Sequence, residues 1–217
     1  MIKEKLTEIK DRLPEDVVLV AVSKTKPNEL LVEAYETGQR IFGENRVQEL
    51  VEKYNSLPKD IEWHMIGHLQ RNKVKQIAPF VALIHGVDSF RLLKEINKQA
   101  EKVNRVQAVL LQFHIAEEDT KFGFDIDEAK SMITSEDFQQ LKNIRVAGVM
   151  GMATFTSDQR QIREEFNRLK SNFDQLKSSF NADFKTISMG MSGDYEIAIS
   201  CGSNMVRIGS TIFGSRN

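Results

Sequence analysis

The feature that most constrains the fold is an alternation, repeated eight times, of a short apolar segment with a stretch of helical periodicity. The first apolar segment, residues 17–22, contains four valines and no charge, which is typical of a strand buried on both faces in a parallel sheet. The eight predicted strands span residues 17–22, 40–43, 61–66, 80–87, 106–115, 143–150, 184–189 and 204–208.

Helical patterns separate these strands. Residues 2–13 carry apolar side chains every three or four positions, which predicts a leading helix that Pro14 ends. Residues 162–180 carry an apolar stripe in steps of four and three, typical of a helix packed on a sheet. Strands that alternate with helices form parallel βαβ units with right-handed crossovers. We therefore predict one α/β domain over residues 1–217, a (β/α)8 TIM-type barrel with an extra N-terminal helix; a doubly wound open sheet is the alternative.

Composition excludes several classes of function. The formal net charge of −1 provides no electrostatic field for nucleic acid or an anionic membrane. One cysteine, Cys201, excludes an internal disulfide and a multi-cysteine metal cluster, and we expect it to be a buried apolar residue. No apolar run approaches the ~20 residues that span a bilayer, and the amino terminus lacks the apolar core of a signal peptide. A cytoplasmic protein is the expectation.

Two glycine- and serine-rich loops follow the last two predicted strands. The first contains Ser192 between two glycines, and the second contains Gly209 and Ser210. Glycine allows the backbone to approach a ligand closely, and the loops after strands seven and eight of such barrels commonly bind phosphate. The sequence therefore predicts a phosphate site built from Ser192, Gly209 and Ser210.

Two cationic side chains are expected at the same end of the barrel. Arg207 shares strand parity with Met205 and Gly209, which would direct it toward the barrel mouth. Lys24 shares parity with Val22 at the carboxyl end of the first strand, where α/β folds keep their chemistry. An amine in a cavity beside other cations becomes a usable nucleophile for a carbonyl.

The neighbouring cations of Lys24 would be Lys26 and Lys121, although either could equally be a solvated loop lysine, which is the favoured interpretation for Lys26. A nucleophilic lysine beside a phosphate site suggests pyridoxal 5′-phosphate (PLP) or a phosphorylated carbonyl substrate, as in class I aldolases. The residues alone leave these two alternatives open. The histidines give less information: His64 and His68 lack a visible third metal ligand, and His85 and His114 lie in apolar strands, as satisfied core residues do.

Six motifs in order resemble those of the pyridoxal-phosphate homeostasis protein family, and the resemblance covers nearly the whole chain. They are residues 21–27 (AVSKTKP), 42–49 (FGENRVQE), 63–73 (WHMIGHLQRNK), 121–123 (KFG), 188–194 (SMGMSGD) and 206–214 (VRIGSTIFG). That family is similar to the barrel domain of bacterial alanine racemases. The resemblance implies a PLP cofactor in an alanine racemase N-terminal-domain-like fold.

The resemblance also implies a role for each site residue. Lys24 would hold PLP as a Schiff base, Arg207 would face the pyridine nitrogen, and Asn45 would contact the ring or its hydroxyl. Ser192, Gly209 and Ser210 would bind the phosphate. Two positions depart from the common family pattern, Asn204 and Ser210, where threonine is frequent. Both keep a polar group, so PLP binding stays the expectation.

The same resemblance implies a protein without efficient catalysis. An arginine at the pyridine nitrogen leaves that nitrogen unprotonated and weakens the ring as an electron sink, and the related racemases take a second base from a further domain. We expect no such domain after the eighth strand. The implied role is intracellular PLP (vitamin B6) homeostasis, storage or delivery; a small racemase-like PLP enzyme that uses Lys24 and Lys121, and the aldolase, are the alternatives.

The expected partners are PLP and, as a hypothesis, apo PLP-dependent enzymes that receive it. We expect neither a nucleic acid nor a membrane as partner, and a monomer or weak homodimer. Nothing in the sequence identifies a docking segment for a recipient enzyme.

Overall fold

The eight strands form one closed parallel barrel in chain order, from β1 next to β2 around to β8 next to β1. The computed structural model describes residues 1–117 and 122–214. Closure is direct: Val18 of β1 is in register with Met205 of β8, and Ala21 of β1 with Phe42 of β2. The strands are β1 (Val18–Val22), β2 (Ile41–Glu44), β3 (Glu62–Met65), β4 (Leu83–Val87), β5 (Gln107–Gln112), β6 (Ile144–Met150), β7 (Thr186–Met191) and β8 (Met205–Ile208).

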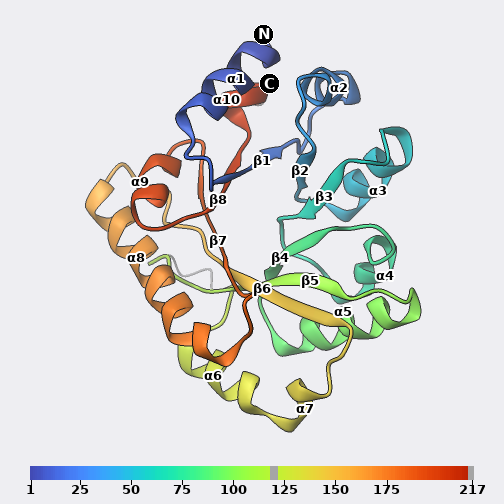
Figure 1. Ribbon diagram of the computed structural model, residues 1–217, viewed down its shortest axis with the longest axis vertical. Coiled ribbons are helices and arrows are strands. Elements are labelled where there is room, and N and C mark those ends of the chain that lie inside the picture. Colours follow the sequence, from blue (N-terminus) through green and yellow to red (C-terminus); the bar gives the residue numbers. More distant parts are fainter. Residues whose placement is uncertain (118–121, 215–217) are drawn as a thin grey trace.

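Helices surround the barrel, as Figure 1 shows. The helix α1 precedes β1 and lies beside α10, so the two ends of the described chain come close together (Figure 1). The described helices are α1 (Ile2–Arg12), α2 (Asn28–Glu36), α3 (Val47–Ser56), η1 (Arg71–Lys73), α4 (Val74–Ile77), α5 (Phe90–Lys102), α6 (Ile126–Thr134), α7 (Glu136–Gln139), α8 (Gln159–Leu176), η2 (Lys177–Ser179), α9 (Tyr195–Ser200) and α10 (Ser210–Phe213). The predicted (β/α)8 barrel and its extra N-terminal helix are confirmed, and the open-sheet alternative is wrong.

Two apolar layers stabilise the barrel. Because strand side chains alternate, Val20 and Val22 of β1 face the interior, whereas Leu19 and Ala21 pack against the helices. The stripe of α8 is buried as predicted from Ile162 to Leu176. Burying one such side chain contributes about 2 kcal/mol, so the helix is held mainly by this face. Phe180 lies beyond the end of α8, after the 3₁₀ turn η2, which shortens the predicted helix.

Several boundaries differ from prediction for local reasons. The strand predicted over residues 80–87 begins at Leu83, because the amide of Val81 still donates to the carbonyl of Ile77. The strand predicted to end at residue 189 continues to Met191. Between β3 and β4 the chain forms only the short pair η1 and α4. Neither α7 nor α10 was predicted from the sequence, since each has four residues and shows no full helical repeat.

Candidate functional site

A cavity of about 400 Å³ opens at the carboxyl ends of the strands. Residues from β1, β8 and the segments after β2, β6 and β7 line it together. The cavity brings together all six residues that the sequence nominated, namely Lys24, Asn45, Ser192, Arg207, Gly209 and Ser210. The six positions are spread over residues 24–210, so the closed barrel is what makes them neighbours.

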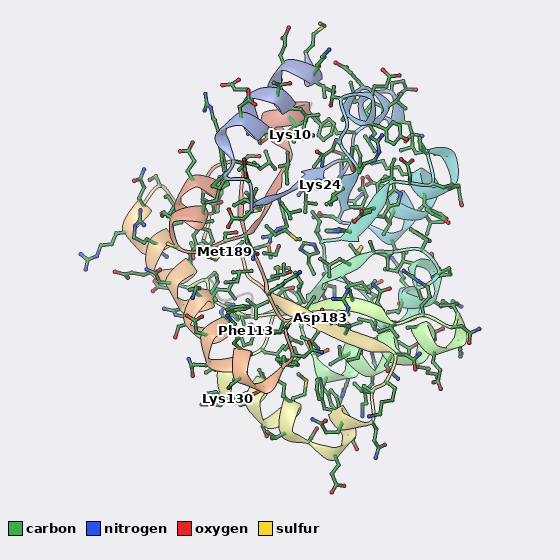
Figure 2. The ribbon with its side chains drawn as sticks, in the orientation of Figure 1. Lys10, Lys24, Phe113, Lys130, Asp183 and Met189 are labelled. Carbon is green, nitrogen blue, oxygen red and sulfur yellow. The ribbon has the colours of Figure 1, made fainter. Side chains whose placement is uncertain are left out.

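Lys24 lies two residues beyond the end of β1, and Figure 2 labels it beside this strand. Val22 faces the barrel interior and lines the cavity with Lys24, but β1 ends at Val22, so the strand parity predicted for Lys24 does not apply beyond that residue. Lys26 lines the same cavity, whereas Lys121 lies outside the described residues. The cavity wall therefore carries two amines two residues apart, both half-buried.

The two loops predicted to bind phosphate are adjacent. The amide of Gly209 donates to the Ser192 hydroxyl over 3.2 Å, which joins the loop after β7 to the end of β8. Asp194 closes the first of these loops, because its Oδ1 accepts from the Met191 amide over 2.6 Å. Burial raises the pKa of Asp194, and this amide and Arg207 oppose the shift. The two loops thus form one polar wall that carries hydroxyls and backbone amides.

Arg207 is 3% exposed and projects from β8 into the barrel. Its Nη1 donates to Ser188 Oγ over 2.6 Å, and its Nη2 donates to the Gly151 carbonyl over 3.2 Å. Burial lowers the pKa of Arg207 to about 10, and Asp194 opposes this shift. An arginine has five N–H donors, so a guanidinium held by these two bonds still has others to offer to the cavity.

Behind Arg207 a chain of polar side chains crosses the barrel interior. His85 Nδ1 lies 2.9 Å from Ser188 Oγ, and His85 Nε2 lies 2.9 Å from His64 Nδ1. The contact between β4 and β7 must pass through the interior, because these strands are not neighbours. His85 is thus the hydrogen-bonded core residue that the sequence suggested.

The order of donors in this chain follows from the arginine. Arginine cannot accept a hydrogen bond, so Ser188 accepts from Arg207 and gives its own hydroxyl proton to His85 Nδ1. A neutral His85 then donates from Nε2 to His64 Nδ1. Burial lowers the pKa of His64 to about 3. Burial, with the charges of His64 and Arg207, lowers the pKa of His85 well below its usual range.

Asn45 reaches the cavity from the segment after β2. A close backbone contact fixes its position: a Cβ on Gly67 would come within 2.4 Å of the Asn45 carbonyl oxygen. A side chain at position 67 would displace the Asn45 segment. Gly67, which lies after β3, therefore acts on the cavity through Asn45.

Sequence reasoning missed the segment after β6. Met152, Thr154 and Phe155 line the cavity, and Phe155 is fully exposed at its mouth. The buried Glu165 of α8 holds this segment: its carboxylate accepts from the Thr154 amide over 2.6 Å and from the Thr154 hydroxyl over 2.7 Å. These lining residues directly follow a strand, at the end of the barrel where such folds carry their sites, and this position is the sequence signal that could have identified them.

The remaining singled-out residues lie outside the cavity. Cys201 is buried in the outer apolar layer, as predicted. His68 is exposed and lies 3.1 Å from an Asp88 carboxylate oxygen. Within residues 1–117 and 122–214, no three His, Cys, Asp or Glu side chains are grouped to hold a metal ion. In the same part of the chain, no helix has the length and apolar character needed to cross a membrane.

Comparisons with known proteins agree with this fold. The family model described as "Alanine racemase, N-terminal domain" matches residues 1–217. The pyridoxal phosphate homeostasis protein of Aquifex aeolicus is 41% identical over 199 residues, which cover 91% of this chain and 86% of that protein. The human protein of the same name is 36% identical and covers 100% of this chain and 84% of its own length. The chain therefore belongs to the pyridoxal phosphate homeostasis protein family, as its motifs predict.

Solved structures extend the comparison. PipY of Synechococcus elongatus PCC7942, solved with PLP bound, superposes with a TM-score of 0.89 at 31% identity over 99% of this chain and 100% of its own. An alanine racemase of Clostridium difficile superposes with a TM-score of 0.81 at 19% identity. It covers 99% of this chain but 60% of the racemase, so the likeness concerns the barrel fold alone.

Proposed function

We propose that this protein binds PLP in the cavity at the carboxyl ends of its strands and acts in PLP homeostasis. One observation carries the proposal: an amine, a buried guanidinium and a wall of hydroxyls and amides line a single cavity of about 400 Å³. The family name and the PLP bound to PipY support it.

The lining groups fit the functional groups of PLP. Ser192 and Ser210 offer hydroxyl donors to a phosphate at the wall formed by the loops after β7 and β8, where Gly209, which has no side chain, lets the phosphate approach the backbone. Arg207 offers donors from the barrel axis, where a pyridine nitrogen can accept them. Asn45 lies on the β2 side, within the same lining as Lys24. PLP supplies an aldehyde that an amine can trap and a ring that withdraws electrons.

Lys24 is the residue that we assign to covalent attachment. Its neutral Nζ attacks the aldehyde carbon, the C=O bond is replaced by C=N, and one water molecule leaves. The side chain stands beyond β1 at the mouth of the barrel, so the attached group can extend toward Arg207 and the phosphate wall. The reaction is reversible by hydrolysis, as storage and delivery of a cofactor require.

The proposed role is to hold PLP without efficient catalysis. The described lining contains no tyrosine, histidine or cysteine, and its ionisable side chains are Lys24, Lys26, Asp194 and Arg207. Arg207, with its pKa of about 10, keeps its proton at neutral pH and leaves the pyridine nitrogen as an acceptor. A ring whose nitrogen is unprotonated is a weak electron sink, which disfavours removal of an α-proton from an amino acid.

Two measurements test this proposal. Protein purified and mixed with PLP should gain a visible absorbance band that survives gel filtration, and a protein that stays colourless contradicts the binding. Solvent deuterium exchange at the α-carbon of a panel of amino acids separates storage from racemisation. Exchange at turnover-like rates, lost in Lys24→Ala, would establish the racemase-like enzyme instead.

Delivery of PLP to apo enzymes is a separate expectation. Holo protein should activate an apo PLP-dependent enzyme even when a trap removes free PLP from solution. Activation that the trap abolishes would restrict the role to storage.

A further inference from the structure

Behind the backbone that carries Lys24 lies a buried ionic cluster, formed by Glu44 of β2 with Lys53 and Glu49 of α3. Lys53 Nζ lies 2.6 Å from Glu44 Oε1 and 3.5 Å from Glu49 Oε2. Lys53 is 6% exposed, and Glu44 is fully buried. The cluster packs between the sheet and α3, on the opposite side of β2 from the barrel interior, and none of its three residues belongs to the described cavity lining.

Each member of the cluster bonds to a residue adjacent to Lys24. The Ser23 hydroxyl donates to Glu44 Oε1 over 2.6 Å, and the Ser23 carbonyl accepts from Lys53 Nζ over 2.8 Å. On the other side of Lys24, the Thr25 amide donates to Glu49 Oε2 over 2.8 Å. Both backbone neighbours of the lysine are therefore held by one cluster.

The backbone conformation of Thr25 explains why these hydrogen bonds are needed. Thr25 has a φ of 63°, in the left-handed region that a β-branched residue rarely adopts. Strained conformations of this kind persist only where surrounding bonds fix them, and they concentrate at functional sites. This conformation turns the chain from β1 toward α2 directly after Lys24, so it sets the direction in which the lysine leaves the sheet.

Burying this cluster costs free energy of folding. Two charges buried between a sheet and a helix lose hydration, and apolar residues of the same size would often stabilise such a site equally well. Burial raises the pKa of Glu44, and Lys53 and Ser23 oppose the shift. A cluster that is retained at this cost, and whose three members together bond to both neighbours of one residue, suits positioning better than stability.

We propose that Glu44, Lys53 and Glu49 are positioning residues that orient Lys24 for Schiff-base formation by holding the peptide groups of Ser23 and Thr25. The proposal rests on the PLP-binding function proposed above and assigns a role to residues outside the cavity. Glu49 is the most informative member, because its bond to the Thr25 amide holds the strained residue directly.

The test compares two ligands in apo protein. Absorbance after mixing with PLP reports the rate of Schiff-base formation, whereas pyridoxine 5′-phosphate, which lacks the aldehyde, reports binding that does not need Lys24. Glu49→Ala should slow Schiff-base formation on the order of tenfold, because a misdirected amine loses its attack geometry, while affinity for pyridoxine 5′-phosphate changes less than about twofold. Glu49→Gln should recover most of the rate, since its amide oxygen can still accept from Thr25.

Two further variants complete the comparison. Glu52→Ala is the matched control, because Glu52 lies on the same helix, is exposed, and accepts a hydrogen bond from the Gln48 side chain of that helix. It should leave both ligands unaffected. Lys53→Met should slow Schiff-base formation at least as strongly as Glu49→Ala, and the unfolding midpoint of each apo variant shows whether it folds.

The outcomes separate the two proposals. Equal rates in Glu49→Ala and wild type, or an equal loss of rate and of pyridoxine 5′-phosphate affinity, would overturn the positioning role and leave PLP binding intact. A wild-type protein that binds pyridoxine 5′-phosphate but forms no Schiff base with PLP would overturn the covalent part of the proposed function, and the positioning role with it.

Discussion

Arg207 Nη1 donates to Ser188 Oγ over 2.6 Å inside the barrel, which couples the cavity to a polar chain on its far side. The bond links β8 to β7 and continues through His85 to His64. A buried guanidinium must be hydrogen-bonded to be tolerated, and Ser188 with the Gly151 carbonyl meets this need. The orientation of Arg207 toward the cavity therefore depends on a residue that does not line it.

Removing the Ser188 hydroxyl should destabilise the fold. Ser188→Ala leaves a buried charged donor and a histidine nitrogen without their partner, which costs about 3 kcal/mol. The measurement is urea unfolding followed by circular dichroism. Ser171→Ala is the control, because Ser171 is exposed on α8, and its effect should stay within about 0.5 kcal/mol. Equal stability of Ser188→Ala and wild type would contradict the coupling.

Stability should decrease as the pH falls below about 6.5. An unfolded histidine gains a proton near pH 6.5, whereas His64 has a pKa of about 3 in the fold, so the unfolded state binds more protons between these values. The free energy of unfolding should fall by about 1.4 kcal/mol per pH unit for each such histidine. The pKa of His85 is also lowered in the fold, so His85 changes the stability in the same direction.

The variant His64→Gln isolates this contribution. Its amide oxygen can accept from His85 Nε2 but does not titrate. The slope of unfolding free energy between pH 6 and pH 4 should therefore become shallower, by about 1.4 kcal/mol per pH unit. An unchanged slope would show that His64 is not buried as a neutral side chain.

The hydroxyls of the two loops should matter for the phosphate and not for the ring. Ser192→Ala and Ser210→Ala should each weaken PLP binding by about tenfold, because a hydrogen bond to a charged group contributes about 1.5 kcal/mol or more. Pyridoxal, which has no phosphate, should bind the variants and the wild type equally. Equilibrium dialysis with both ligands checks this, and a parallel loss for pyridoxal would place the phosphate elsewhere.

The segment after β6 should depend on the buried carboxylate of Glu165. Glu165→Gln replaces one acceptor oxygen by an NH₂ group that faces the Thr154 donors, which should cost about 2 kcal/mol. Hydrogen exchange at the Thr154 amide should accelerate as well. Glu164→Gln, one residue earlier and exposed, should change neither quantity. Equal behaviour of the two variants would contradict the anchoring role.

The fold and the cavity residues could be predicted because they follow strand periodicity. Lys24 follows the apolar run of the first strand, Arg207 shares parity with the interior residue Met205 of the last strand, and Ser192 and Gly209 lie in glycine-containing loops at strand ends. Such signals are local. They can be used without knowing which strands pair, since a parallel barrel brings the carboxyl ends of all its strands to one face.

The contacts that hold these residues could not be predicted, because their partners are distant in the sequence. Ser188 and His85 are 103 positions apart, and Ser23 and Glu44 are 21 apart. Lys53 resembles any charged residue of an amphipathic helix until β2 places Glu44 beneath it. Register and helix packing decide these pairs, and neither can be deduced from one sequence.

Reductive trapping at Lys24 tests the central claim most directly. Holo protein is treated with borohydride, digested, and mapped by mass spectrometry for the phosphopyridoxyl group. The label should lie on Lys24, disappear in Lys24→Ala, and persist in Lys26→Ala, which removes the other described lysine of the cavity wall. A label on Lys26, or an undiminished visible band in Lys24→Ala, would contradict the assignment of Lys24 as the residue that holds PLP.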